Sequence, residues 1–553
     1  MICGFAVLVA LSCLTAVVSA DEPRTFNVRD FGAVPDGNED AGGAIRAAIS
    51  AATASGSGAV VALKAGAYRV KPAPGQTDCF PIVSAAGLTI RGAGPATRIV
   101  VTNPACGAFM FANGKDVALC DLTIDFDPLP FCQGTIRTVD VASGSSDLDV
   151  DEGYPMPDAP NFVHAQEPYG KWGMIIDRTT RRIRTGTPDH YMTPKWEHVD
   201  KRVYRFFTAA EHYRLGLRSM QVGDGYVHLA RGYGGAVLAQ FCEGIRIENV
   251  VVHASPGLAV GLVGNSKEAF VRGLKVVFPA DGTRLLTTNA NGVHCQQNRV
   301  GPVVEGCTFE GMADDAVNIY TPPNTLLEVR GPIEWVVTGG CRVLAGDRLQ
   351  VFDPKAGLVR GEVRVRSVRP EAGKLALTLE APFEGAAPGL DHRTGDTLYD
   401  LSTCGAGFRI AGNRVNGNRR YGCLLRAGDG VVEDNVFADM TGGGVVLTNE
   451  PGWPEGPVPW GITIRRNRFI RGGTCQGYAD APGGASLIVR GVRLASGLAE
   501  GRPVHGIVVE GNEFEDVSGT AMYFGAVDGL TARGNRIRAV AGSPPTAPLA
   551  IGE

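Results

Sequence analysis

Two adjacent aspartates are the residues of this chain whose types and spacing best suit acid–base chemistry. Asp314 and Asp315 stand in the segment EGMADDAVNIYT, and Asn291 precedes them by 23 and 24 residues in the segment TTNANGVHCQQ. Two nearby carboxylates repel each other, so one of them holds its proton more tightly than it does in water. The pair can therefore supply a general acid and a general base within one site.

Hydrolysis of a glycosidic bond needs such an acid and such a base. Carboxyl groups about 6.5–9.5 Å apart leave room for an attacking water and imply inversion of configuration. The competing interpretation is that Asp314 and Asp315 only serve a turn. Their position amid a repetitive segment, between two insertions and beside the polar NANGVH patch, favours catalysis. Other polar residues near the pair in sequence are expected to contact a substrate: Asn289, His294, Asn318, Tyr320 and Arg284.

A repeat of about 22 residues must position these side chains. Segments such as IRIENVVV (from Ile245), VVEGCTF (from Val303) and VVEDNVF (from Val431) share two alternating apolar residues, a turn residue and another apolar residue. This period indicates one coil of a parallel β-helix. Coils stack about 4.8 Å apart, so Asn291 is expected almost directly beneath the aspartate pair. A column of turn residues is expected to form a structural ladder: Asn249, Asn413, Asn435, Asn467, Asn512 and Asn535.

The rest of the chain divides around this repeat. Residues 21–131 are expected to form N-terminal coils, with an amphipathic helix after Asp40 that covers the open apolar end of the solenoid. Two stretches alternate apolar and polar residues at period two, which predicts β-rich, barrel-like insertions at 132–240 and 326–402. Residues 241–325, with the aspartates, and residues 403–553 complete the β-helix. The opening segment resembles the start of many right-handed parallel β-helix proteins related to pectin-degrading enzymes.

Composition limits the partners and the compartment. A net charge of -4 gives no basic surface for nucleic acid, and 75 glycines favour turn-rich β structure over long helices. Residues 1–20 are apolar and end in Val18-Ser19-Ala20, which predicts a signal peptide and an exported protein, periplasmic or extracellular. No later stretch is apolar and long enough to span a membrane. Cys79 and Cys106 are a candidate disulfide, and no cysteine or histidine cluster suggests zinc, so no metal or other cofactor is expected.

The segment NANGVH followed by FEGMADDAVN resembles the pattern of glycoside hydrolase family 110, the inverting exo-α-1,3-galactosidases. In that family NADGVH precedes FEG, two aspartates and AVN. The similarity extends to the GYPMP, ARGYGGA, HASPG and GDRLQVFDPKAG segments. It implies an all-β, right-handed parallel β-helix of the pectin lyase-like superfamily that acts on an oligosaccharide or glycan, with Asp314 and Asp315 as the paired catalytic aspartates. The third carboxylate of the family corresponds to position 291, where this chain has Asn, which takes no proton at neutral pH.

Two other functions are compatible with the same fold, because fold alone does not determine function. A uronate lyase or epimerase abstracts a proton next to a carboxylate, usually with Lys or Arg, but no Lys adjoins the predicted site in sequence. A glycan-binding β-helix that has lost catalysis is suggested by Asn291. Residues of later coils and loops are further candidates for the cleft, with a purely structural role as the alternative for both tryptophans: Arg426, Asn449, Trp453 and Trp460.

Overall fold

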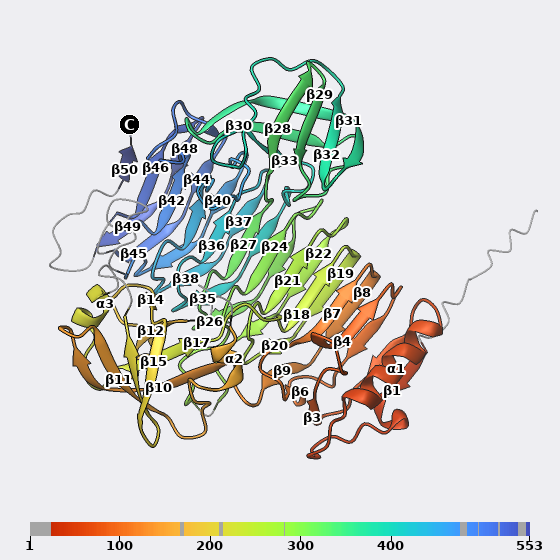
Figure 1. Cartoon of the computed structure of the whole chain (residues 1–553), viewed down its shortest axis with the longest axis vertical. Coiled ribbons are helices and arrows are strands. Elements are labelled where there is room, and N and C mark those ends of the chain that lie inside the picture. Colours follow the sequence, from red (N-terminus) through yellow and green to blue (C-terminus); the bar gives the residue numbers. More distant parts are fainter. Residues whose placement is uncertain are drawn as a thin grey trace, which may run out of the picture.

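Three long parallel sheets form a solenoid (Figure 1). The computed structural model describes residues 24–165, 171–208, 214–280, 282–475, 484–495, 497–517, 520–539 and 549–552. Sheet A runs from β1 (Thr25–Asn27) to β48 (Thr531–Arg533), sheet B from β3 (Gly66–Val70) to β49 (Arg536–Ala539), and sheet C from β4 (Asp78–Val83) to β50 (Leu549–Gly552). Each coil passes through sheets A, B and C in that order, and the predicted right-handed parallel β-helix is confirmed.

The central coils carry the strands that matter for the site. In sheet A these strands are β19 (Glu243–Glu248), β22 (Ala269–Arg272), β25 (Val303–Glu305) and β34 (Arg409–Ala411). In sheet B they are β20 (Val251–Val252), β23 (Lys275–Val276), β26 (Thr308–Glu310) and β35 (Arg414–Asn416). In sheet C they are β18 (Val237–Gln240), β21 (Val260–Val263), β24 (Val293–Gln296), β27 (Val317–Tyr320) and β36 (Cys423–Leu425).

The outer coils continue the same sheets in both directions. The N-terminal coils contain β2 (Val60–Ala62), β5 (Thr89–Arg91), β8 (Lys115–Cys120), β6 (Thr97–Val101), β9 (Thr123–Phe126) and β7 (Gly107–Ala112). The C-terminal coils contain β37 (Val431–Glu433), β40 (Thr463–Arg465), β44 (Val508–Glu510), β38 (Val436–Ala438), β41 (Arg468–Ile470), β45 (Glu513–Val517), β39 (Val445–Leu447), β42 (Leu487–Arg490) and β46 (Met522–Gly525).

Alternation along each strand puts apolar side chains inside the solenoid. In β24, Val293 and Cys295 are buried in the core, while His294 and Gln296 point outward and are partly exposed. Rings from three successive coils stack inside with centroids 5.3 and 4.7 Å apart: Phe437, Phe469 and Phe514. Because each coil buries its apolar residues mainly against its neighbours, the stacked array rather than a single coil is the stable unit.

An asparagine ladder runs along one corner of the C-terminal half. The side chain of Asn435 accepts the backbone N–H of Asn413 at 2.9 Å and donates to Oδ1 of Asn467 at 2.9 Å, and the pattern continues to Asn512 and Asn535. The residue just before each of these asparagines has a left-handed backbone conformation, with a positive φ, and the asparagine itself does not. Asn249 itself has a φ of 54°, is exposed, and donates to Asp121, so the prediction that it belongs to the ladder is wrong.

The N-terminal end is covered by helix α1 (Gly42–Ala54), which follows the short helix η1 (Val28–Phe31). Its buried face includes Ile45, Ala48 and Ile49, as the sequence predicted. Oδ1 of Asp40 accepts the N–H of Gly42 at 2.9 Å. The sulfur atoms of the candidate disulfide pair lie 3.9 Å apart, in adjacent coils, and the two cysteines are not bonded.

Two insertions interrupt the solenoid and lie on opposite sides of it (Figure 1). The first leaves sheet B after β9 and forms an eight-stranded sheet: β10 (Phe131–Asp140), β11 (Ser145–Val150), β12 (Trp172–Asp177), β13 (Arg182–Ile183), β14 (Tyr191–Met192), β15 (Lys195–Asp200), β16 (Val203–Phe207) and β17 (Gly225–Leu229). It also contains α2 (Pro160–Val163) and α3 (Arg214–Ser219), and the chain is back in sheet C at β18.

The second insertion follows β27 and forms a closed antiparallel barrel: β28 (Asn324–Gly331), β29 (Glu334–Thr338), β30 (Arg348–Asp353), β31 (Leu358–Glu371), β32 (Lys374–Leu379) and β33 (Thr397–Asp400). It has a core of its own around the buried Trp335. Within the described residues, no helix is both long and apolar enough to cross a membrane. The predicted signal peptide lies outside them.

Candidate active site

Asp314 and Asp315 lie in the turn between β26 and β27, at the start of a sheet C strand. On a regular strand, neighbouring side chains point to opposite faces, and one carboxylate would have entered the apolar bore. Because Asp314 and Asp315 lie in the turn and not on a strand, their side chains do not have to point to opposite faces. Both residues are nevertheless more than nine-tenths buried, with 6% of Asp314 and 2% of Asp315 exposed. The pair therefore occupies a sheltered site in which charge interactions are strong.

Asp315 is fixed between the coils on either side of it. Val293 pairs with Val317, and this register places Asn291 one coil below Asp315, as predicted. Nδ2 of Asn291 lies 3.5 Å from Oδ2 of Asp315, at the long limit of a hydrogen bond. One coil above, the backbone N–H of Tyr421 donates to Oδ1 of Asp315 at 3.0 Å. Both carboxyl oxygens of Asp315 thus face a positioned polar group.

Asp314 faces guanidinium groups instead. Arg231, which follows the last strand of the first insertion, donates to Oδ2 of Asp314. Arg419, from the coil above, brings Nη1 to 3.5 Å from Oδ1 of Asp314. The Nε of Arg419 pairs with Asp189 of the first insertion at 3.0 Å, and its guanidinium carbon lies 5.0 Å from the ring of Trp172. The first insertion therefore supplies Arg231 and helps to position the guanidinium of Arg419 beside Asp314.

These environments drive the pKa values of the two aspartates in opposite directions. Burial, and then the negative charge of Asp314, raise the pKa of Asp315 to about 7. Burial by itself also raises the pKa of Asp314, but Arg231, Arg419 and Arg420 outweigh it and hold that pKa below its usual value. Near neutral pH, Asp314 is ionised and Asp315 is partly protonated. One carboxyl group is thus suited to be a base and the other an acid.

The outward face of sheet C continues the site with hydrogen-bonded side chains. His294 and Asn318 are opposite each other in the register of β24 and β27, as predicted. Nδ1 of His294 is 3.3 Å from Oδ1 of Asn291, and its Nε2 is 3.2 Å from the hydroxyl of Tyr320, which donates to Gln296 at 2.9 Å. Burial lowers the pKa of His294, so this imidazole is neutral at pH 7. It can therefore hydrogen-bond a hydroxyl but adds no charge.

Arg426, from the coil above, contacts Asn318 on this outward face of sheet C. It is fully buried, and its Nη1 donates to Oδ1 of Asn318 at 3.0 Å. The same guanidinium pairs with Glu455 at 2.9 Å and with Glu450, both in the loop after β39. This loop is therefore anchored next to the site by charge. Its Trp453 is 56% exposed, and the indole N–H of Trp453 donates to Glu455 at 3.0 Å.

Several predicted residues have structural roles elsewhere. Asn289 is fully buried and donates to the carbonyls of Pro130 and Ala230 at 3.0 Å each, which ties both ends of the first insertion to the solenoid. The Nδ2 and Oδ1 of Asn449 both bond the backbone of Val492 at 2.9 Å. The ring of Trp460 packs over Gly428. These contacts give each of the three side chains a structural role, although in the part of the chain that the structure describes the buried Oδ1 of Asn289 has no hydrogen-bond partner.

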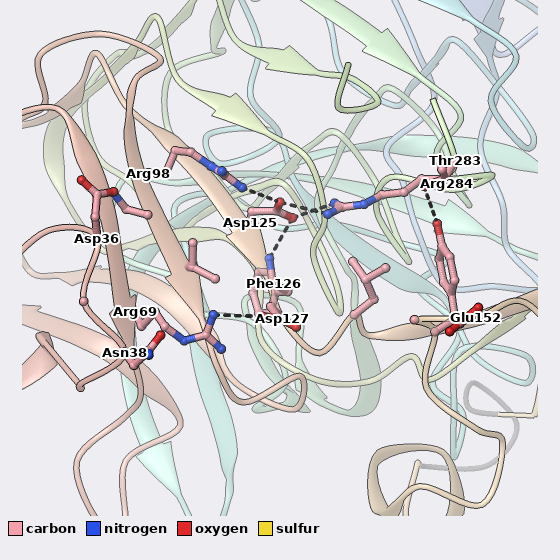
Figure 2. A pocket seen from close by; sticks show the side chains of 16 residues that line it. Asp36, Asn38, Arg69, Arg98, Asp125, Phe126, Asp127, Glu152, Thr283 and Arg284 are labelled. Carbon is pink, nitrogen blue, oxygen red and sulfur yellow. Dashed lines mark hydrogen bonds and ion pairs between the residues drawn. The ribbon is translucent and has the colours of Figure 1, made fainter. Parts of the chain in front are cut away.

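Arg284 is also placed away from the aspartates. It forms a two-pronged ion pair with Asp125, at 2.7 and 3.0 Å, and lines a separate cavity of about 610 Å³. Figure 2 shows Arg98 and Arg284 reaching Asp125 from opposite sides, with Arg69 beside Asp127. The side chain of Arg284 thus contacts Asp125 rather than the aspartate pair, and its contact with a substrate stays a prediction.

The sequence pattern did not reveal the arginines around Asp314. Arg419 and Arg420 lie one coil above the aspartates in the segment NRRYG, but the barrel separates the two segments by more than one hundred residues. Arg231 stands in the ARGYGGA segment, which resembled the family without indicating a role. A register count that skips the barrel aligns NRRYG with MADDA, and this was the available signal.

Family models match two parts of the chain. Residues 25–116 match the model described as rhamnogalacturonase A/epimerase, pectate lyase-like, and residues 401–543 match the right handed beta helix region. Both matches fall on the solenoid coils at either end of the structure. They agree with the parallel β-helix described above.

Individual proteins are similar at low identity. Alpha-1,3-galactosidase B of Akkermansia muciniphila is 24% identical over 476 residues, which cover 80% of this chain and 58% of that protein. A protein of the same name from Phocaeicola vulgatus is 23% identical over 597 residues, which cover 93% of this chain and 90% of that protein. Among solved structures, the catalytic unit of a GH87 alpha-1,3-glucanase from Streptomyces thermodiastaticus has a TM-score of 0.43 at 12% identity and covers 96% of this chain and 68% of that chain. The chain spans between 51% and 64% of the length of the first three curated relatives.

Proposed function

We propose that this protein is a glycoside hydrolase that releases terminal α-1,3-linked galactose with inversion of configuration. The observation that carries the proposal is the asymmetry of the buried pair: Asp314 contacts the guanidinium groups of Arg231 and Arg419, whereas Asp315 contacts the amide of Asn291 and a backbone N–H. The similarity to proteins named alpha-1,3-galactosidase supports the choice of substrate. Export after cleavage of residues 1–20 is part of the same proposal, because these residues are apolar and end in Val18-Ser19-Ala20.

In this proposal Asp315 is the general acid. Its proton passes to the glycosidic oxygen as the bond from that oxygen to the anomeric carbon breaks. Asp314 is the general base and removes a proton from a water as the water oxygen bonds to the anomeric carbon from the opposite face. The products are β-galactose and an alcohol, with Asp315 ionised and Asp314 protonated. Exchange of one proton with solvent restores the starting state.

Neighbouring residues position these two groups. The amide of Asn291 and the N–H of Tyr421 orient the carboxyl of Asp315, at 3.5 and 3.0 Å. Arg231 and Arg419 keep Asp314 ionised and fix its direction. With both proton transfers assigned to Asp314 and Asp315, the reaction does not require a carboxylate at position 291. Asn291 then binds a hydroxyl or orients the acid.

Proton NMR of the mature protein with the disaccharide Gal-α-1,3-Gal tests this function. The expected result is release of galactose whose β anomer appears before the α anomer. Asp314→Asn and Asp315→Asn are the matched controls and should slow release from this substrate by about 10²–10⁴-fold. No release by the natural sequence, with release by Asn291→Asp, would contradict the assignment of the base to Asp314.

The glycan-binding alternative rests on Asn291 and has a distinct outcome in the same experiment. It predicts that the disaccharide binds, that neither the natural sequence nor Asn291→Asp releases galactose, and that Asp314→Asn changes nothing in the spectrum of the sugar. A lyase or epimerase acts on a uronate, so it predicts no free galactose from this disaccharide and a change only in an added uronate-containing oligosaccharide.

A further inference from the structure

A second cavity lies beneath the barrel, where the sheet C strands end. The aspartate pair lies at the other end of these strands, where they begin. It measures about 290 Å³, at the small end of the range of about 300–1,000 Å³ for ligand sites. The solenoid contributes one wall and the barrel loop before β30 contributes the other. The lining of this cavity includes Phe241, Gly264, Gln297, Arg299, Arg342 and Leu344.

Phe241 is the unusual member of this cavity. It follows β18 at a corner where the backbone is left-handed, with a φ of 56°, and the side chain is 45% exposed. The corresponding corner residues of neighbouring coils are Asn113, Gly264 and Gln297, which are glycine or polar. A bulky residue in this conformation is strained, and such strain concentrates at functional sites. An exposed ring gains no core packing that would explain it.

The ring of Phe241 occupies space that only a glycine leaves free. A Cβ at Gly264 would lie 2.6 Å from the Cε1 of this ring. One edge of the aromatic side chain therefore rests on the backbone of the next coil, which limits its rotation. The remaining surface of the ring faces the cavity. The ring of Phe241 thus provides a fixed apolar surface among the polar groups of the cavity.

The barrel wall is held in place by charge. Arg299 pairs with Asp347 through two contacts of 2.9 and 3.2 Å, and Asp347 accepts the N–H of Leu344 at 2.7 Å. The side chain of Gln297 donates to the backbone carbonyl of Arg342 at 3.2 Å. Among the described residues, the guanidinium of Arg342 has neither an ion pair nor a hydrogen bond. It is available to a ligand.

The cavity and the candidate active site lie at the two ends of the same strand. Asn291 lies two residues before β24, and Gln297 follows its last residue. At roughly 3.3 Å per residue, the two ends are about 20 Å apart. The outward side chains of β24, and Val263 and Leu238 in the two preceding coils, are partly exposed, whereas the outward Asn318 and Tyr320 of the following strand β27 are buried. The length of this surface matches that of an oligosaccharide of several residues.

We propose that the cavity is a subsite for the aglycone, holding a neutral pyranose several residues from the scissile bond. The C–H face of that sugar packs on the ring of Phe241, and Arg342 and Gln297 hydrogen-bond its hydroxyls. The inference rests on the proposed glycosidase function and extends it. The protein therefore prefers oligosaccharides to disaccharides.

The test compares kcat/KM for Gal-α-1,3-Gal and for a linear pentasaccharide with the same non-reducing end. Phe241→Asn removes the ring and keeps a residue that tolerates the left-handed backbone. It should lower kcat/KM for the pentasaccharide by about 3- to 10-fold, the range that one aromatic contact provides, through KM and not kcat. The disaccharide value should not change. Leu390→Ala, on the barrel and 90% exposed, is the matched control.

Equal losses on both substrates, or no loss on the pentasaccharide, would overturn the inference. If the natural sequence hydrolyses neither sugar, the proposed function fails, and calorimetric binding of the same two sugars then decides the inference separately. Tighter binding of the pentasaccharide than of the disaccharide, lost in Phe241→Asn and kept in Leu390→Ala, supports the subsite. Equal binding of the two sugars overturns it.

Discussion

Nδ2 of Asn291 lies 3.5 Å from Oδ2 of Asp315, although 24 residues separate them in sequence. The parallel register of β24 and β27 creates this contact. The neighbour is a neutral amide, so the charge state of Asp315 is governed by burial and by Asp314. Because of this contact, a substitution at position 291 should change the pKa of Asp315, the proposed general acid, directly.

The first prediction concerns pH. The acid must be protonated to act, so kcat/KM should fall as pH rises through about 7, the pKa of Asp315. Asp315→Asn should lower kcat/KM by about 10²–10⁴-fold and abolish this basic limb. Rates measured from pH 4 to 9 on Gal-α-1,3-Gal check both statements.

The control for this prediction is the leaving group. Nitrophenolate is a good leaving group and needs no proton from the enzyme. On a nitrophenyl α-galactoside, Asp315→Asn should therefore recover much of its rate, whereas Asp314→Asn should not. Equal recovery in the two variants would contradict the separate roles of acid and base.

The second prediction concerns Asn291→Asp. A new carboxylate beside Oδ2 of Asp315 disfavours further ionisation, so the apparent pKa of the coupled group should rise and the basic limb should move above pH 7. The pH dependence of kcat/KM for the variant measures this shift. A large rise in rate with an unmoved basic limb would instead identify position 291 as the site of a missing base.

The third prediction concerns the arginines around Asp314. Arg419→Gln removes a positive charge that favours the ionised carboxylate, so the pKa of Asp314 should rise. The base is then protonated at a higher pH, and the acidic limb of the kcat/KM profile should move upward. Arg231→Gln should act in the same direction. An acidic limb that stays in place in both variants would show that Asp314 is not the titrating base.

The fourth prediction concerns Arg284, which the sequence had placed in the site. Its side chain and that of Asp125 are 13% and 4% exposed. Arg284→Gln leaves a buried carboxylate without its main partner, and the free energy of unfolding should fall by about 3 kcal/mol. The pH profile of kcat/KM should match that of the natural sequence. Urea unfolding and the same rate assay separate the two effects, and a shifted profile would return Arg284 to the active site.

The fifth prediction concerns the asparagine ladder. Asn435→Ala removes bonds to Asn413, Asn467 and the carbonyl of Ile410 in a buried corner, so unfolding should become easier by at least about 1–3 kcal/mol. Asn249→Gly, at an exposed left-handed position outside the ladder, should change stability little. Urea unfolding of both variants measures the contrast. Similar losses in the two would contradict the distinction between ladder and corner residues.

Local patterns in the sequence were enough for much of this molecule. The spacing of about 22 residues predicted the solenoid, and counting one coil back from Asp315 placed Asn291 beneath it, because parallel stacking turns a fixed period into direct contact. Period-two alternation indicated both insertions for the same local reason. Proximity in sequence alone was a poor guide to the site. Arg284 and Asn289 lie close to Asn291 along the chain, yet their side chains face other neighbours.

Only the tertiary structure decided which charges meet. Arg231 and Asp189 come from the first insertion and Arg419 from a coil beyond the barrel, and no local pattern specifies how insertions of this length dock. Their placement determines which aspartate is ionised, because a pKa depends on burial and on charges within a few ångströms rather than on sequence neighbours. The sequence by itself determined the pair of carboxyl groups and the coil that carries them. The packing of distant segments decided the different environments of those two groups.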